Sequence, residues 1–211
     1  FILARQGSYW LIEEPRAGNS RFEIAGGKSH AFTLDQGGFT VFPFFTDAAL
    51  KGVKSVNDAI VVAVVEQDTY VVAVEMKTSA NKTSEALKQI ESGRLFAAWV
   101  RQLLSLYGHW TDGPCKFFGV VSLKPRRQPP KGSSRRTAEL PSPLQSTHGG
   151  GYPYFVLGNH PRVSIADLVQ KISGAPGICG TAAPIRKATP THGMATLNQQ
   201  RTHKYIAARQ Q

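Results

Sequence analysis

Cysteines and long apolar runs are scarce in this chain, and their scarcity excludes two classes of protein. Only two cysteines occur, Cys115 and Cys179, so there is no disulfide framework of the kind that small secreted proteins use. We therefore expect a reducing, cytoplasmic location. No apolar stretch reaches the roughly 20 residues needed to cross a bilayer, so we expect no membrane partner.

Several familiar catalytic and metal-binding signatures are incomplete. Lys28 and Ser29 resemble the end of a phosphate-binding P-loop, but the glycine required five positions before Gly27 is replaced by Phe22. No nucleophile elbow marks a serine hydrolase. Three candidate zinc ligands are too scattered for a recognised zinc-site spacing: Cys179, His192 and His203.

Acidic residues are also few, and the resulting positive charge is unevenly placed. The chain of 211 residues has 25 Lys+Arg against 14 Asp+Glu, a formal net charge of +11. Residues 1–115 carry a net charge of −1, whereas residues 116–211 carry +12. This asymmetry indicates that one region grips a polyanion such as nucleic acid. The alternative is a basic surface without a specific partner.

The most concentrated basic segment extends from Lys124 to Arg136. Its prolines, glycine and serines predict a loop. We expect this loop to contact nucleic-acid phosphates, the alternative being a solvated loop that binds nothing. The expected contact residues are Lys124, Arg126, Arg127, Lys131, Arg135 and Arg136.

The middle of the chain predicts a hairpin followed by a βαβ crossover. The β-branched runs 59–65 and 69–74 flank a short polar break, which is typical of adjacent antiparallel strands. Apolar residues recur at helical spacing from about Asn81 to Tyr107, with Asn81 or Thr83 as the expected cap. A further strand is predicted at Cys115–Leu123, parallel to its partner after the helix.

Three charged residues interrupt these apolar runs. Asp58 opens the first strand, and Glu75 and Lys77 close the second, so alternation puts Glu75 and Lys77 on one face. The hairpin brings Asp58 next to Glu75. Two converging carboxylates suit Mg²⁺ or Mn²⁺, which prefer oxygen ligands, and the lysine can stabilise charge that develops on phosphorus. The alternative is an ordinary Glu75–Lys77 ion pair on a strand face.

With these elements in this order, the chain resembles the PD-(D/E)XK, or restriction-endonuclease-like, nuclease superfamily over roughly residues 40–125. The resemblance implies an α/β fold with an αβββαβ core and a mixed central sheet. It implies that Asp58, Glu75 and the Met76 carbonyl bind the metal and that Lys77 is catalytic. Gln89 matches a glutamine that some branches carry near the site. Two departures are an asparagine in place of the proline that gives the family its name, and the lack of an evident first helix.

These observations together predict a Mg²⁺-dependent endonuclease acting on DNA, of the kind used in host defence, restriction or mobile-element processing. The expected nuclease domain covers residues 1–172, and residues 173–211 form a basic tail rich in Gly, Ala, Pro and Thr. The tail follows a short helix expected at residues 163–172. An aromatic segment at Phe39–Phe45 is expected in a core or interface. Cutting both strands would favour a homodimer or a larger assembly.

Two other functions stay open at this stage. A non-catalytic nucleic-acid-binding or assembly module would have the same charge distribution, with Glu75 and Lys77 only ion-paired. An RNA-directed nuclease would share the site and differ in its substrate. An assay with divalent metal distinguishes the binding module from a nuclease, because the module would never shorten the nucleic acid that it binds.

Overall fold

The structure is a computed structural model that describes residues 2–13, 21–35, 55–110, 113, 115–124, 139–149 and 151–175. Its helical elements are the 3₁₀ turn η1 (Ala80–Lys82), α1 (Thr83–Leu106) and α2 (Ile165–Ser173). Its strands are β1 (Arg5–Gln6), β2 (Tyr9–Glu13), β3 (Arg21–Ala25), β4 (Lys28–Phe32), β5 (Ala59–Val65), β6 (Asp68–Lys77), β7 (Cys115–Leu123), β8 (Leu144–Gln145), β9 (Pro153–Leu157) and β10 (Arg162–Ser164).

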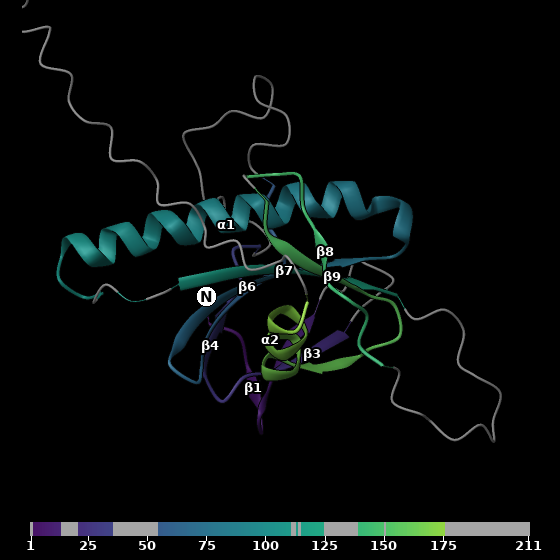
Figure 1. Cartoon of the computed structure of the whole chain (residues 1–211), viewed down its shortest axis with the longest axis horizontal. Helices are drawn as coiled ribbons and strands as arrows, with labels where there is room; N and C mark the ends of the chain where they lie inside the picture. The colour runs from purple at the N-terminus through teal and green to yellow at the C-terminus, as the bar shows by residue number, and fades with distance from the viewer. Residues whose placement is uncertain are drawn as a thin grey trace, which may run out of the picture.

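A six-stranded mixed sheet forms the centre of the molecule, with the order β4-β5-β6-β7-β9-β8. Strands β4, β5 and β6 pair antiparallel in succession. The chain then crosses over through α1, so that β7 pairs parallel to β6 and β9 parallel to β7. Three neighbouring parallel strands therefore end at the same edge of this sheet (Figure 1).

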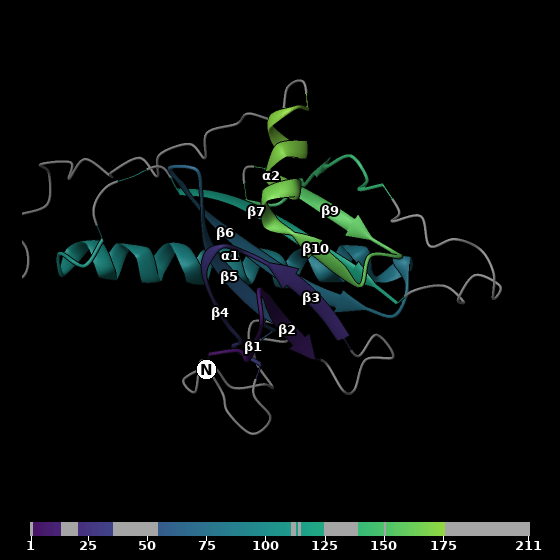
Figure 2. The same cartoon turned by 90° about the horizontal axis from the view of Figure 1, so that it is seen from below.

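The two faces of the six-stranded sheet are covered differently. On one face α1 packs through Leu87 and Ile90 against Ala73 of β6 and Val121 of β7. On the other face lie α2 and the four-stranded sheet β1-β2-β3-β10 (Figures 1 and 2). One continuous apolar core joins the six-stranded sheet to the four-stranded sheet and to α2. Burial of this core is the main stabilising contribution to the fold.

The hairpin that presents the candidate site contains an unusual turn. Val65 pairs with Asp68, so only Glu66 and Gln67 make the connection. Glu66 has a φ of 57°, a left-handed backbone conformation that glycine adopts more readily. The short turn fixes the register of β5 against β6 and thereby the position of Asp58 relative to Glu75.

Most elements predicted from the sequence are confirmed. Strands β5 and β7 have the predicted bounds, and β6 contains the predicted run 69–74 and ends at Lys77, the residue expected to close it. The parallel pairing of β6 with β7 across a helix is also confirmed, as is the general α/β class. In the described ranges, neither helix is apolar enough over a sufficient length to span a membrane.

Two local predictions are wrong. Neither Asn81 nor Thr83 caps α1: the chain first makes η1, the N-cap of α1 is Lys82, and the Thr83 hydroxyl donates to the Ala80 carbonyl at 2.7 Å. Val163 belongs to a strand and not to the following helix, since β10 pairs parallel with β3; Ser164 ends this strand and is also the N-cap of α2, as the sequence suggests, although its side chain makes no capping hydrogen bond. The aromatic segment Phe39–Phe45 and the tail beyond residue 175 lie outside the described residues.

Candidate active site

The two carboxylates meet where β6 extends beyond the first residue of β5. Ala59 pairs with Val74, and β6 continues for three more residues to Lys77. In this extension the Asp58 N–H donates to Glu75 Oε2 at 3.2 Å, and the Met76 N–H donates to Asp58 Oδ2 at 2.5 Å. Beyond the Ala59–Val74 pair, the Asp58 side chain replaces a strand backbone as the partner of Met76 N–H. The Asp58 carboxylate therefore lies beside that of Glu75.

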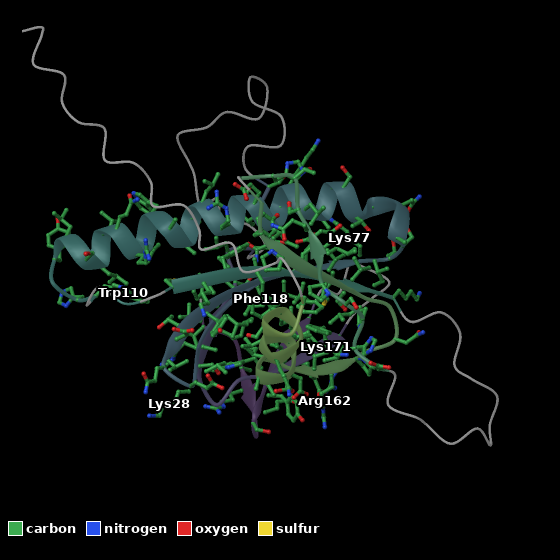
Figure 3. The ribbon with its side chains drawn as sticks, in the orientation of Figure 1. Lys28, Lys77, Trp110, Phe118, Arg162 and Lys171 are labelled. Atoms are coloured by element: carbon green, nitrogen blue, oxygen red, sulfur yellow. The ribbon has the colours of Figure 1, made fainter. Side chains whose placement is uncertain are left out.

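Lys77 lies on the same face as Glu75 and is held by side chains from two elements. Its Nζ is 2.7 Å from Glu75 Oε1 and donates to Gln89 Oε1 at 2.6 Å. Gln89, on α1, also donates through Nε2 to the Val56 carbonyl at 3.1 Å. The amide of Gln89 thus links Lys77 to the segment just before β5. Figure 3 shows Lys77 between the sheet and the first turns of α1.

The structure brings together all four residues that the sequence singled out as catalytic: Asp58, Glu75, Lys77 and Gln89. It also adds Glu85, whose Oε1 lies 3.8 Å from Lys77 Nζ. Sequence reasoning missed Glu85, although it precedes Gln89 by four residues and so shares a helix face with it.

Burial dominates the electrostatics of the pair of acids. Glu75 is only 2% exposed. Burial first, and the charge of Asp58 second, raise its pKa to about 8, while the hydrogen bond and charge of Lys77 act in the opposite direction. The positive charge of Lys77 therefore does not fully offset the burial of Glu75 and the negative charge of Asp58. An additional cation at this position would favour the ionised form of Glu75.

The donor atoms of the site fit a hard divalent cation. They are carboxylate oxygens of Asp58 and Glu75, and the backbone contributes a third. The Met76 N–H points to Asp58, and within a strand the carbonyl of the same residue points to the same edge. The Lys77 carbonyl points the other way and accepts from the Lys124 N–H at 2.9 Å.

This donor set is a small one. No group of three or more His, Cys, Asp or Glu side chains capable of holding a metal is found among the described residues. Mg²⁺ commonly binds proteins through one or two carboxylates and retains several waters, so two carboxylates and one carbonyl are sufficient for it. The same set is a poor match for zinc, which favours nitrogen and sulfur ligands.

A buried asparagine positions the start of β5, a role that no sequence pattern indicates. Asn57 is fully buried, and its Nδ2 donates to the carbonyls of Ala59 and, at 3.4 Å, Val74. Its Oδ1 faces Gly93 of α1, where an added Cβ would lie 2.1 Å away. The glycine in the middle of α1 therefore allows the helix to pack closely over the residue that precedes Asp58.

Only one of the predicted nucleic-acid contacts lies in the described part of the chain. Lys124 follows β7 directly, and its backbone is bound to that of Lys77. The other five predicted contacts lie outside the described residues: Arg126, Arg127, Lys131, Arg135 and Arg136. Their participation stays a prediction.

No protein-family model, curated protein or solved structure matches this chain. The class of protein must therefore be inferred from strand order and from the geometry of Asp58, Glu75 and Lys77. A fold alone does not determine an activity, so the site carries more weight here than the sheet.

Proposed function

We propose that this protein is a divalent-metal-dependent nuclease of the PD-(D/E)XK type that hydrolyses DNA. The observation that carries the proposal is the meeting of Asp58, Glu75 and Lys77 at one end of the β5–β6 hairpin. Gln89 adds to this observation, because it comes from a separate element and still contacts Lys77.

The order of elements supports this class. Strands β4, β5 and β6 form an antiparallel meander, α1 follows, and β7 adds parallel to β6, which is the βββαβ part of the superfamily core. The part before it differs from the superfamily pattern. Among the described residues no helix precedes β4, and the face opposite α1 is covered by the four-stranded sheet and α2.

In the proposed reaction, Asp58, Glu75 and the Met76 carbonyl would hold Mg²⁺ or Mn²⁺. The bound ion would supply a lowered pKa for water and neutralisation of phosphate charge. Lys77, fixed by Gln89, would stabilise the negative charge that develops on the phosphoryl oxygens and would orient the attacking water.

Hydrolysis adds the elements of water across the P–O3′ bond. The water oxygen bonds to phosphorus, the P–O3′ bond breaks with its electron pair going to O3′, and a proton from the water ends on O3′. By the superfamily resemblance, the products would carry a 5′-phosphate and a 3′-hydroxyl. Burial of Glu75 keeps bulk water from this side of the acids, which strengthens the interactions of Lys77.

A second function has its own support. Lys77 already forms a 2.7 Å ion pair with Glu75, so the two charges could serve only to join β6 to α1 in a non-catalytic nucleic-acid-binding module. Such a module would bind DNA equally well with and without divalent metal and would leave its length unchanged. The position of Asp58 favours the nuclease, since its carboxylate lies beside that of Glu75, an arrangement that a simple Glu75–Lys77 ion pair does not require.

The test is a cleavage assay on labelled duplex DNA, single-stranded DNA and RNA, with Mg²⁺, Mn²⁺ or EDTA. The variants are Lys77→Ala and Asp58→Asn, with Lys28→Ala as the control. Asparagine at position 58 retains an oxygen that can accept from the Met76 N–H. A loss of activity in Asp58→Asn would therefore not reflect the loss of this hydrogen bond. Lys28 starts β4 at the opposite end of the sheet, as its pairing with Val64 and Figure 3 show.

We expect metal-dependent shortening of DNA by the wild-type protein and by Lys28→Ala. Loss of the Lys77 charge should lower the rate by a factor on the order of 10²–10³, the usual effect of removing one such donor. Melting temperatures measured in parallel identify any variant that fails to fold. Cleavage that persists in Lys77→Ala would rule out this site as its source, and metal-independent binding without cleavage would favour the binding module.

A further inference from the structure

A cavity of about 240 Å³ lies at the carboxyl ends of the three parallel strands β6, β7 and β9. Its lining comes from the residues that follow each strand: Thr78 and Ser79 after β6, Lys124 after β7, and Gly158 and Asn159 after β9. In open α/β sheets, ligands bind outside the carboxyl ends of the strands. The volume is below the roughly 300–1,000 Å³ of pockets for drug-sized ligands and suits a small chemical group.

The lining of this cavity has the chemistry of an anion site. The residues that line it include Thr78, Asn159 and Lys124, whose side chains carry a hydroxyl, an amide and an ammonium group, and none of them is an aspartate or glutamate. Within the described ranges, Lys124 forms no ion pair. Hydroxyl, amide and ammonium donors around a small space match the oxygens of a phosphate group.

The cavity adjoins the candidate active site. Leu123, which also lines it, is beside Lys77 in the β6–β7 register, so both side chains point to the face covered by α1. Thr78 follows Lys77 directly, and consecutive Cα atoms are about 3.8 Å apart. The backbone hydrogen bond from Lys124 to Lys77, at 2.9 Å, fixes the ends of the two strands together.

We propose that this cavity binds a backbone phosphate of the nucleic acid next to the one that is cleaved. The inference rests on the proposed nuclease function and deepens it: Lys77 acts on the scissile phosphate, and Thr78, Lys124 and Asn159 hold a neighbouring phosphate. Such a contact fixes the register of the strand at the site and does not depend on base sequence.

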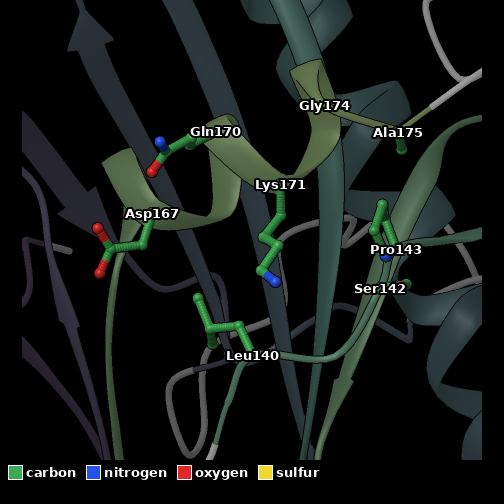
Figure 4. A pocket seen from close by; sticks show the side chains of 8 residues that line it. All are labelled: Leu140, Ser142, Pro143, Asp167, Gln170, Lys171, Gly174 and Ala175. Carbon is green, nitrogen blue, oxygen red and sulfur yellow. The ribbon is translucent and has the colours of Figure 1, made fainter.

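A second cavity, of about 770 Å³, has a different chemistry. It lies between α2 and the segment that contains Leu140 and Pro143 (Figure 4). Its cation, Lys171, forms a 3.0 Å ion pair with Glu139, and Asp167 adds a negative charge to the lining. A phosphate would be repelled there, so the cavity beside Lys77 is the better phosphate site.

The test measures DNA binding in EDTA, where no cleavage occurs, by fluorescence anisotropy of a labelled duplex and a labelled single strand at several salt concentrations. The variants are Lys124→Ala and Thr78→Val, with Lys28→Ala as the matched loss of one positive charge far from the cavity. Each phosphate contact by a cation contributes about 0.7–0.9 to the slope of log K against log salt. Lys124→Ala should therefore lower the slope by about one.

A second arm locates the contact. Duplexes carrying one uncharged methylphosphonate linkage at successive positions should include one position, next to the cleavage site, at which binding weakens. At that position Lys124→Ala should cause little further loss, because the charge that it contacts is already absent. Thr78→Val should weaken binding without changing the slope, since it removes a neutral donor.

The outcomes separate this inference from the proposed function. If the wild-type protein cleaves DNA but Lys124→Ala and Thr78→Val bind it as tightly and with the same slope as the wild type, the phosphate subsite is refuted and the nuclease stands. A slope that falls equally in Lys28→Ala refutes the subsite as well. If the wild-type protein neither binds nor cleaves nucleic acid, both proposals fail.

Discussion

Glu75 gives the most quantitative prediction, because its carboxyl group is buried beside a second acid. Burial and the charge of Asp58 raise its pKa from an ordinary 4.5 to about 8 in the folded protein. Between these two pH values, the folded protein without metal keeps a proton that the unfolded chain has lost. Stability contributed by this proton is fully present below pH 4.5 and is lost as pH rises through 8.

The magnitude follows from the size of the shift. Each pH unit in this window lowers the free energy of unfolding by at most about 1.4 kcal/mol. Between pH 5 and pH 8 the upper limit is roughly 4 kcal/mol, which is a large fraction of the stability of a typical domain. Coupling to Asp58 spreads the loss over a wider pH range and does not change its direction.

The assay compares the wild-type protein with Glu75→Gln in EDTA, by urea unfolding followed by circular dichroism from pH 5 to pH 8. Glutamine has the shape of glutamate but does not titrate. Its single amide oxygen can replace only one of the two Glu75 oxygens, so either the Asp58 N–H or Lys77 Nζ loses its bond to residue 75, while Lys77 keeps its bond to Gln89 Oε1. The difference in free energy of unfolding, wild type minus variant, therefore isolates the titration of Glu75.

We expect this difference to decrease steadily as pH rises. A difference that stays constant from pH 5 to pH 8 would mean that Glu75 is ionised throughout this range, as it would be in a fully compensated ion pair with Lys77. That result would refute the electrostatic basis for placing a divalent cation between the two acids.

Three further predictions concern the elements that position the site. Gly93→Ala should lower the free energy of unfolding by about 1–3 kcal/mol in urea, because the new Cβ would lie 2.1 Å from Asn57 Oδ1; unchanged stability would show that α1 does not need this close approach. Glu66→Gly should raise stability by about 1 kcal/mol, since it removes a non-glycine residue at a φ of 57°, and a lower melting temperature would contradict this. Gln89→Ala should lower kcat by a factor of about 10–100 with little change in KM, because Lys77 loses the partner that orients it; an equal loss of DNA affinity in EDTA would argue against a positioning role.

The sequence was sufficient for the elements whose signal is local. The β-branched runs gave the bounds of β5 and β7, and helical spacing gave α1 to within two residues at each end. Alternation along a strand correctly put Glu75 and Lys77 on one face, and the short hairpin correctly brought Asp58 to Glu75. Each of these inferences depends on residues within about 20 positions of one another.

Features that depend on distant contacts were missed. Lys28–Phe32 begins with three polar residues and has no alternating apolar pattern, yet it becomes a strand by pairing with β5. Val163 reads locally as helical and is held in a strand by pairing with Ile24, far earlier in the chain. The role of Gly93 depends on Asn57 across the helix–sheet contact, so helical spacing alone could not predict it. Local propensity is overridden in each case by tertiary pairing.

The central claim is that Asp58 and Glu75 hold a divalent metal ion beside Lys77. The most direct test is a crystal structure of the protein with Mn²⁺, recorded with anomalous scattering. We predict one manganese peak bound by carboxylate oxygens of Asp58 and Glu75 and by the Met76 carbonyl, at about the 2.0–2.1 Å typical of small octahedral cations or slightly longer. An intact 2.7 Å ion pair between Glu75 and Lys77 with no manganese between the acids, at saturating Mn²⁺ and pH 8, would contradict it.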